Sequence, residues 1–205
     1  MTTELAVVRH GQTEFNRRGL YQGHADSPLT AAGEAQALRL APRLRSLNCS
    51  AVYCSDLGRA RRTAELLVRP SARRIREDAA LRERSYGAFE GLSRGEIAAQ
   101  YPDARIASGA ANPDYTPPGG ETQDEFNKRV TRAFDRIASE HAGQRVLVVT
   151  HGGVVTAFAR YVLGVPENAP RLFDIANTSL SLFYRDDGRR WMVRFLGDVS
   201  HLAAC

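Results

Sequence analysis

Two short runs of consecutive apolar residues, at 5–8 and 146–149, are each followed within three residues by a histidine and a glycine. Runs of this length that are rich in β-branched residues are typical of parallel strands buried on both faces of a sheet. A third, weaker run at 51–54 leads into Ser55 and Asp56, which can begin a helix. We therefore predict strands at these three places.

Apolar residues at helical spacing lie between and after these runs. Thr30 can cap a helix that starts near residue 31 and that Pro42 can kink. The residues expected to face inward on this helix are Leu38, Ala41, Leu44 and Leu47. Further helices are predicted over 57–68, from about 122 to 137, and over 154–163. Near the carboxyl end, Asp187 and Gly188 separate two strand-like segments and predict a hairpin.

Strands that alternate with helices of this length indicate an α/β fold. We predict a three-layer α/β/α sandwich with a mostly parallel central sheet and helices on both faces. The length of 205 residues suits a single domain over 1–205. The stretch 101–120 holds four of the nine prolines and fits neither pattern. Because long irregular loops in compact domains are usually functional, we expect it to cap an active site.

The composition excludes several classes of protein. The formal net charge is +5, and all of the basic residues except Lys128 are arginines spread along the chain, without a nucleic-acid-binding motif. We expect no nucleic-acid partner and no membrane association, since no apolar run is long enough to cross a bilayer. The start of the chain lacks the features of a secretory signal, and the three cysteines have no metal-ligand spacing. These features favour a cytoplasmic protein with reduced thiols, and they leave the oligomeric state open, a homodimer included.

The pattern Val-Val-x-His-Gly occurs twice, at 7–11 and at 148–152. Each copy places a histidine at the carboxyl end of a predicted buried strand, which is the edge of an α/β sheet where ligands bind. If the two strands are parallel neighbours, His10 and His151 point into one crevice. A single histidine in such a place is usually structural, but two in matching contexts, with Arg9 beside the first, favour a functional site.

The residues near this crevice restrict its chemistry. The five histidines lack the spacing of a zinc or iron site, and the chain has no serine elbow and no phosphate loop of the Walker type. Histidine as a nucleophile toward phosphorus is the option that is left, with arginines binding the phosphoryl oxygens through their planar donor pairs. We therefore expect neither a metal nor another cofactor.

The segment 8–16, which reads VRHGQTEFN, resembles the signature of the histidine phosphatase superfamily, the phosphoglycerate mutase-like proteins. The resemblance continues in order through 21–33, 55–64, 81–91, 118–122 and 150–153, and so covers nearly the whole chain. It implies a phosphoglycerate mutase-like fold and a small phosphorylated substrate.

The resemblance also implies roles for single residues. His10 would be the nucleophile that becomes phosphohistidine, and Glu83 would protonate the leaving oxygen and later activate water. The other groups would bind the phosphoryl group: Arg9, Arg59 and His151, with Asn16, Gln22 and the Gly152 amide as further donors. Glu90 is a second candidate for the acid, and a surface ion pair of Glu83 with Arg82 or Arg84 is the alternative without function.

Three functions remain open at this point. Hydrolysis of a phosphate monoester is favoured over mutase-type phosphoryl transfer. The segment 95–127 is short, and it contains six acidic residues but only one basic residue, Arg105. A mutase needs positive charge for the second anionic group of its ligand. A binding protein that has kept the fold without catalysis is the least favoured, since all of the candidate catalytic residues are present.

Overall fold

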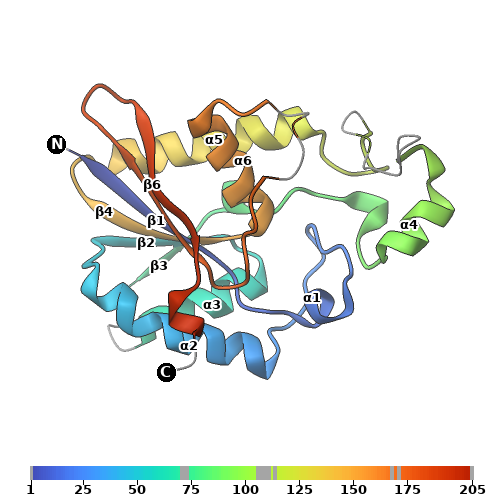
Figure 1. Cartoon of the computed structure of the whole chain (residues 1–205), viewed down its shortest axis with the longest axis horizontal. Helices are drawn as coiled ribbons and strands as arrows, with labels where there is room; N and C mark the ends of the chain where they lie inside the picture. The colour runs from blue at the N-terminus through green and yellow to red at the C-terminus, as the bar shows by residue number, and fades with distance from the viewer. Residues whose placement is uncertain are drawn as a thin grey trace.

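The computed structural model describes residues 2–69, 74–104, 112, 115–166, 169 and 172–203, and its centre is one six-stranded sheet (Figure 1). The strand order is β3-β2-β4-β1-β5-β6. The strands are β1 (Thr3–Arg9), β2 (Ala51–Cys54), β3 (Ile75–Glu77), β4 (Arg145–Thr150), β5 (Leu180–Arg185) and β6 (Trp191–Asp198). The three strands predicted from apolar runs are therefore adjacent in the middle of the sheet.

The register of the sheet brings the ends of β1 and β4 together. These strands are parallel neighbours, with Val7 opposite Val148 and Arg9 opposite Thr150. β2 pairs in parallel with β4 and with β3, whereas β5 and β6 add an antiparallel edge beyond β1. The mostly parallel sheet and the carboxyl-terminal hairpin are both confirmed.

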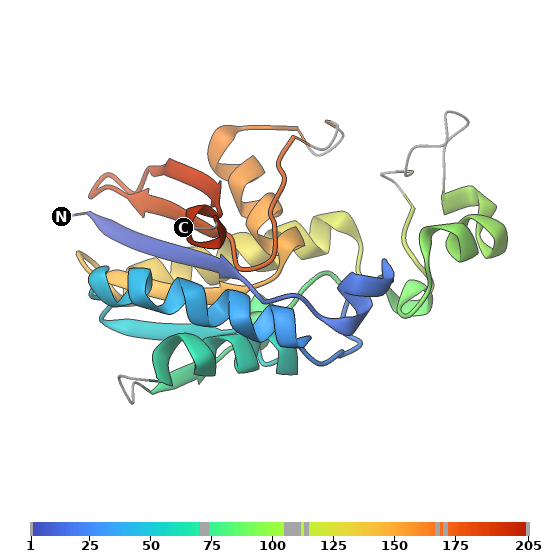
Figure 2. The same cartoon turned by 60° about the horizontal axis from the view of Figure 1, so that its bottom comes forward.

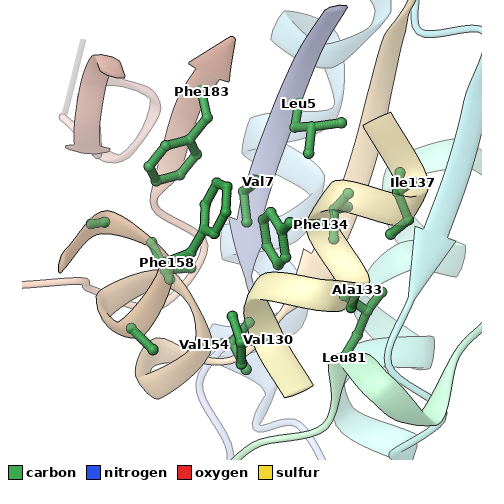
Figure 3. Close-up of a cluster of buried hydrophobic side chains, with 14 of the residues drawn as sticks. Leu5, Val7, Leu81, Val130, Ala133, Phe134, Ile137, Val154, Phe158 and Phe183 are labelled. Carbon is green, nitrogen blue, oxygen red and sulfur yellow. The ribbon is translucent and has the colours of Figure 1, made fainter. Parts of the chain in front are cut away.

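Helices cover both faces of the sheet, which confirms the three-layer sandwich (Figures 1 and 2). The longer helices are α2 (Ala31–Ser46), α3 (Gly58–Val68), α5 (Gln123–Glu140) and α6 (Gly152–Leu163). Alternate residues of a strand point to opposite faces, so Val7 packs with α5 and α6 while Val8 packs with α2 and α3. Figure 3 shows the aromatic part of the first core, in which the Phe134 and Phe158 ring centroids are 4.1 Å apart.

Short elements surround the carboxyl edge of the sheet and were not all predicted. They are α1 (Glu14–Arg18), α4 (Arg94–Gln100), η2 (Ala79–Leu81), η3 (Gly87–Phe89), η4 (Pro102–Ala104) and η5 (Ser200–Leu202). Part of the loop predicted at 101–120, residues 105–111 and 113–114, lies outside the described residues. Its described ends lie near α4, which stands apart from the sheet (Figure 2). Within the described part of the chain, no helix combines the length and the apolar composition that crossing a membrane requires.

The inward face predicted for α2 is partly wrong. Leu38 is 50% exposed and Leu47 is only partly buried. The residues that are buried on this helix are Gly33, Ala37, Leu40, Ala41 and Leu44. Several of them are small, and small residues let the helix lie close to the sheet, so a search for large apolar residues alone misplaces the stripe. Pro42 is exposed, and the helix continues through it.

Leu38 and Leu40 give a matched test of this corrected face. Leu40→Ala should lower the free energy of unfolding by about 2–5 kcal/mol, since it removes a fully buried side chain and leaves a cavity. Leu38→Ala, on the exposed face of the same helix, should change it by no more than about 0.5 kcal/mol. Urea unfolding of both variants measures the difference, and equal losses would contradict the observed face.

Candidate active site

The ends of β1 and β4 place His10 and His151 side by side. Their ring centroids are 5.2 Å apart and the ring planes are inclined by 61°. His10 is 3% exposed, and His151 is fully buried. The two copies of Val-Val-x-His-Gly therefore meet at one point, because the parallel register carries equivalent residues of both strands to the same edge.

The His10 ring is held in one tautomer. Its Nδ1 lies 2.8 Å from the carbonyl oxygen of Gly11. Because a carbonyl can only accept a hydrogen bond, Nδ1 carries the proton and Nε2 keeps its lone pair. Burial lowers the pKa of His10 well below its ordinary value, and the positive charges of Arg59 and Arg9 lower it further. The ring is therefore neutral and its Nε2 can act as a nucleophile.

His151 is held differently. Neither of its ring nitrogens has a hydrogen-bond partner within the described structure, although both are buried. Burial is again the main reason that its pKa is well below the ordinary value, with Arg59 and then His10 adding to the effect. Since buried polar atoms are normally paired, these two nitrogens indicate that the site is complete only with a ligand.

Arg59 brings a buried positive charge into the site from the first turn of α3. It is 1% exposed, and its terminal nitrogens donate to the carbonyl oxygens of Ala25 at 3.0 Å and Gly23 at 2.7 Å. Its Nε is buried and has no partner among the described residues. Asp26 lies 3.5 Å away but is about half exposed, so it only partly offsets the charge. Arg9 approaches from β1 and donates to the Ile175 carbonyl oxygen at 2.6 Å.

Three further donors are expected from the sequence, namely Asn16, Gln22 and the Gly152 amide. Asn16 belongs to the capping box at the start of α1, and Gln22 accepts a hydrogen bond from the Thr13 hydroxyl at 3.0 Å through its oxygen. Gly152 is the first residue of α6, where backbone amides and the helix dipole favour an anion. A Cβ on Gly152 would lie only 3.3 Å from Nε of Arg9, so a larger residue would crowd this arginine.

Glu83 is fixed against the same helix terminus. One carboxylate oxygen accepts from the Gly153 amide at 2.9 Å and the other from the Arg84 amide at 2.9 Å. A Cβ on Gly153 would lie 2.1 Å from Oε1 of Glu83, so only glycine allows this approach. The surface ion pair considered above does not form, because the guanidinium of Arg82 binds Asp56 and that of Arg84 binds Gln123 and the Glu121 carbonyl.

Glu90, the second candidate for the acid, joins two loops beside the site. Its carboxylate accepts hydrogen bonds from the backbone amides of His24, Ala25 and Tyr86, at 2.8–2.9 Å. These contacts tie the loop that binds Arg59 to the segment that carries Glu83. Glu90 therefore holds two loops together, and its use as the acid stays a prediction.

Arg129 on α5 is a supporting residue that the sequence did not reveal. It donates to the carbonyl oxygens of Ala80, Arg82 and Glu83 and forms a two-pronged ion pair with Glu121. It thereby fixes the backbone on both sides of the Glu83 side chain. In the sequence it is one arginine among many on a polar helix face, and no local pattern distinguishes it.

A protein-family model, described as the histidine phosphatase superfamily (branch 1), matches residues 5–198. The chain belongs to the histidine phosphatase superfamily. Its relatives within the superfamily include the Arabidopsis thaliana phosphoglycerate mutase-like protein 4, which is 40% identical over 97% of this chain and 86% of the relative. The phosphoglycerate mutase-like architecture and the enzyme class predicted from the sequence are thus confirmed.

Solved structures of the superfamily agree with this architecture. YhfR from Bacillus stearothermophilus has a TM-score of 0.89 and 34% identity, covering 98% of this chain and 100% of its own. The mycobacterial glucosyl-3-phosphoglycerate phosphatase, solved with VO3, has a TM-score of 0.82 and 30% identity, covering 95% and 98%. Among the described residues of this superfamily member, no group of three or more His, Cys, Asp or Glu side chains could hold a metal ion.

The two buried histidines make the stability of this superfamily member sensitive to acid. In the unfolded chain a histidine binds a proton near pH 6.5, whereas the pKa of His10 and of His151 in the fold is well below that value. The unfolded state therefore binds more protons between these values. The free energy of unfolding should be highest above about pH 7 and fall below pH 6.5, by about 1.4 kcal/mol per pH unit for each histidine.

Urea unfolding between pH 5 and 8, in buffer without phosphate, measures this slope. In His151→Asn the free energy of unfolding should change less steeply with pH, because the contribution of His151 is missing. Leu40→Ala serves as the control, because it destabilises the core without removing a titrating group. A slope that is the same in wild type and His151→Asn would show that burial does not suppress protonation of His151.

Proposed function

We propose that this protein hydrolyses a small phosphate monoester through a phosphohistidine formed on His10. The observation that carries the proposal is the neutral, buried His10 ring, with Nε2 as its free lone pair, beside His151 and next to two guanidinium groups. Positive charge and a neutral nucleophile at one point suit attack on a phosphoryl group, because phosphoryl transfer depends on positioning and on charge stabilisation.

In the first half of the reaction, Nε2 of His10 forms a bond to phosphorus as the bond to the leaving oxygen breaks. Glu83, entering as the carboxylic acid, gives its proton to that oxygen. In the second half, the Glu83 carboxylate takes a proton from water, the water oxygen bonds to phosphorus, and the bond to Nε2 breaks. Phosphate leaves, and both residues return to their starting forms.

The remaining residues stabilise the phosphoryl oxygens in this scheme. Arg9 and Arg59 supply charge and donors, His151 supplies a donor, and Asn16, Gln22 and the Gly152 amide complete the set. The buried Nε of Arg59 and the ring nitrogen of His151 that carries the hydrogen are groups that a bound phosphate would satisfy.

The segment 101–120 is proposed as the cap of this site. Its described end contacts the Glu83 segment directly, since Ala88 donates to the Pro118 carbonyl at 2.9 Å, and the next residue along the chain, Glu121, donates to the Ser85 carbonyl at 3.0 Å. The Tyr115 ring stacks on Phe89 with centroids 5.8 Å apart. We propose that residues 1–205 form a single domain and that the segment 101–120 covers the leaving group bound at its site. The cytoplasmic location and the lack of a nucleic-acid partner stay predictions, and homodimer formation stays open.

Hydrolysis is favoured over phosphoryl transfer between two positions of a substrate. A phosphoglycerate carries a carboxylate besides its phosphate, and a mutase must bind both groups. Near Glu83, however, the guanidinium groups of Arg82 and Arg129 are paired with the carboxylates of Asp56 and Glu121. The names of the relatives include both a phosphoglycerate mutase-like protein and a phosphatase, so mutase activity is the second candidate. A binding protein without catalysis is the third.

The first test removes the nucleophile. Wild type should release phosphate from p-nitrophenyl phosphate and form an acid-labile, base-stable phosphoenzyme in rapid-quench experiments. His10→Ala should show neither, because no other neutral nucleophile has the same position. An adduct that persists in His10→Ala would move the nucleophile to another residue, with His151 as the first to examine. Incubation with 3-phosphoglycerate separates hydrolysis, which releases phosphate, from mutase activity, which yields 2-phosphoglycerate.

The second test examines Glu83 as the acid through the leaving group. Glu83→Gln should slow the burst with an alkyl phosphate by about 10²–10⁴-fold, and with an aryl phosphate much less, since a phenolate leaves without a proton. Arg59→Ala should slow both substrates alike, because it removes charge stabilisation whatever the leaving group. Equal losses for both substrates in Glu83→Gln would exclude Glu83 as the acid.

A further inference from the structure

Asn177, in the segment before β5, touches both the candidate nucleophile and a candidate phosphate donor. Its side-chain nitrogen Nδ2 donates to the carbonyl oxygen of His10 at 3.0 Å and to Oδ1 of Asn16 at 3.1 Å. Both acceptors are oxygens, so both hydrogens of this amide are used and its orientation is fixed. No motif in the sequence directs attention to Asn177, which is far from residues 10 and 16 along the chain.

The same contact fixes the amide of Asn16. Oδ1 of Asn16 accepts from the Thr13 backbone amide at 3.2 Å and from Asn177 at 3.1 Å. A backbone amide can only donate, so the oxygen of Asn16 must face Thr13 and Asn177. The nitrogen Nδ2 is then turned the other way as a donor, and within the described structure no protein group accepts from it. The orientation that phosphate binding requires is therefore set before a ligand arrives.

We propose that Asn177 is a positioning residue for phosphoryl transfer. It acts through Asn16, whose Nδ2 it presents to a phosphoryl oxygen, without contacting the substrate itself. This inference rests on the proposed function of the site. Outer contacts of this kind, which orient the groups that bind the ligand, commonly change activity by about 10–100-fold.

The backbone next to Asn177 is held in a strained conformation. Thr178 has a φ of +56°, which is rare for a β-branched residue, and its amide faces the carbonyl oxygens of Arg9 and His10 at 3.1 and 3.2 Å. Its hydroxyl donates to the Asn177 carbonyl at 2.8 Å and lies 3.1 Å from Nε2 of His201 in η5. Strain of this kind persists where surrounding contacts fix the conformation, and here these contacts fix the position of Asn177.

A double-mutant cycle tests whether Asn177 acts through Asn16. Asn177→Ala and Asn16→Ala should each lower kcat/KM for p-nitrophenyl phosphate by about 10–100-fold. The double variant should be no slower than the slower single variant, because the contact is already lost. If the two losses multiply instead, Asn177 does not work through Asn16 and the proposal is wrong.

A matched control separates positioning from general stability. Ser181 on β5 is buried, whereas Asn177 is partly buried, and the Ser181 hydroxyl accepts from the Gly197 amide at 3.0 Å, away from the site. Ser181→Ala should lower the thermal midpoint by an amount similar to Asn177→Ala and leave kcat/KM unchanged. Loss of activity in proportion to stability in both variants would overturn the proposal. If Asn177→Ala does not fold, Asn177→Ser, which keeps one donor, replaces it in the cycle under the same criterion.

The same double-mutant cycle can be measured without turnover, through the binding of orthovanadate in a calorimeter. The two single variants should bind vanadate about 10–100-fold more weakly than wild type, and the double variant should be no weaker than the weaker of them. A wild type that binds vanadate but hydrolyses no ester would contradict the proposed function, while the binding cycle would still decide the role of Asn177. A wild type that hydrolyses esters together with multiplying losses would contradict the role of Asn177 alone.

Discussion

The parallel pairing of β1 with β4 is the contact on which the site depends. It carries two histidines to one edge and leaves their rings 5.2 Å apart. A shift of one residue in this register would send one histidine to the opposite face of the sheet, since side chains alternate. The register is secured by the continuous burial of both strands, because Val7 and Val148 pack against one layer of helices while Val8 and Val149 pack against the other. The core is thus what aligns the catalytic candidates.

Burial also gives the site its electrostatic character. Arg59 is charged and almost completely enclosed, and carbonyl oxygens rather than a buried carboxylate receive most of its hydrogen bonds. This arrangement keeps the charge in place without neutralising it. Burial lowers the pKa of both histidines, and the remaining positive charge lowers it further and favours an incoming anion. A phosphate monoester has the negative charge and the acceptor oxygens that suit these groups.

The sequence alone predicts the parts of the fold that follow from continuous patterns. Apolar runs identify β1, β2 and β4, and the stripe on α5 is regular, so these elements are found where they were expected. The strand β3 escapes prediction because it has only three residues, two of them exposed, and depends on β2 for its pairing. On α2 the buried face uses glycine and alanine, which a search for large apolar residues overlooks.

Sequence patterns also predict only some of the residues of the site. The sequence pattern points to the residues expected to touch the substrate, since a motif and a family resemblance mark them. It does not point to Arg129, Asn177 or the structural use of Glu90, whose partners include backbone groups from distant segments. A backbone carbonyl or amide is the same in every residue, so nothing in the sequence records which one a side chain will bind. Only the fold decides it. The groups that aim the candidate catalytic residues are therefore the least predictable part of the site, although the geometry of His10, Asn16 and Glu83 depends on them.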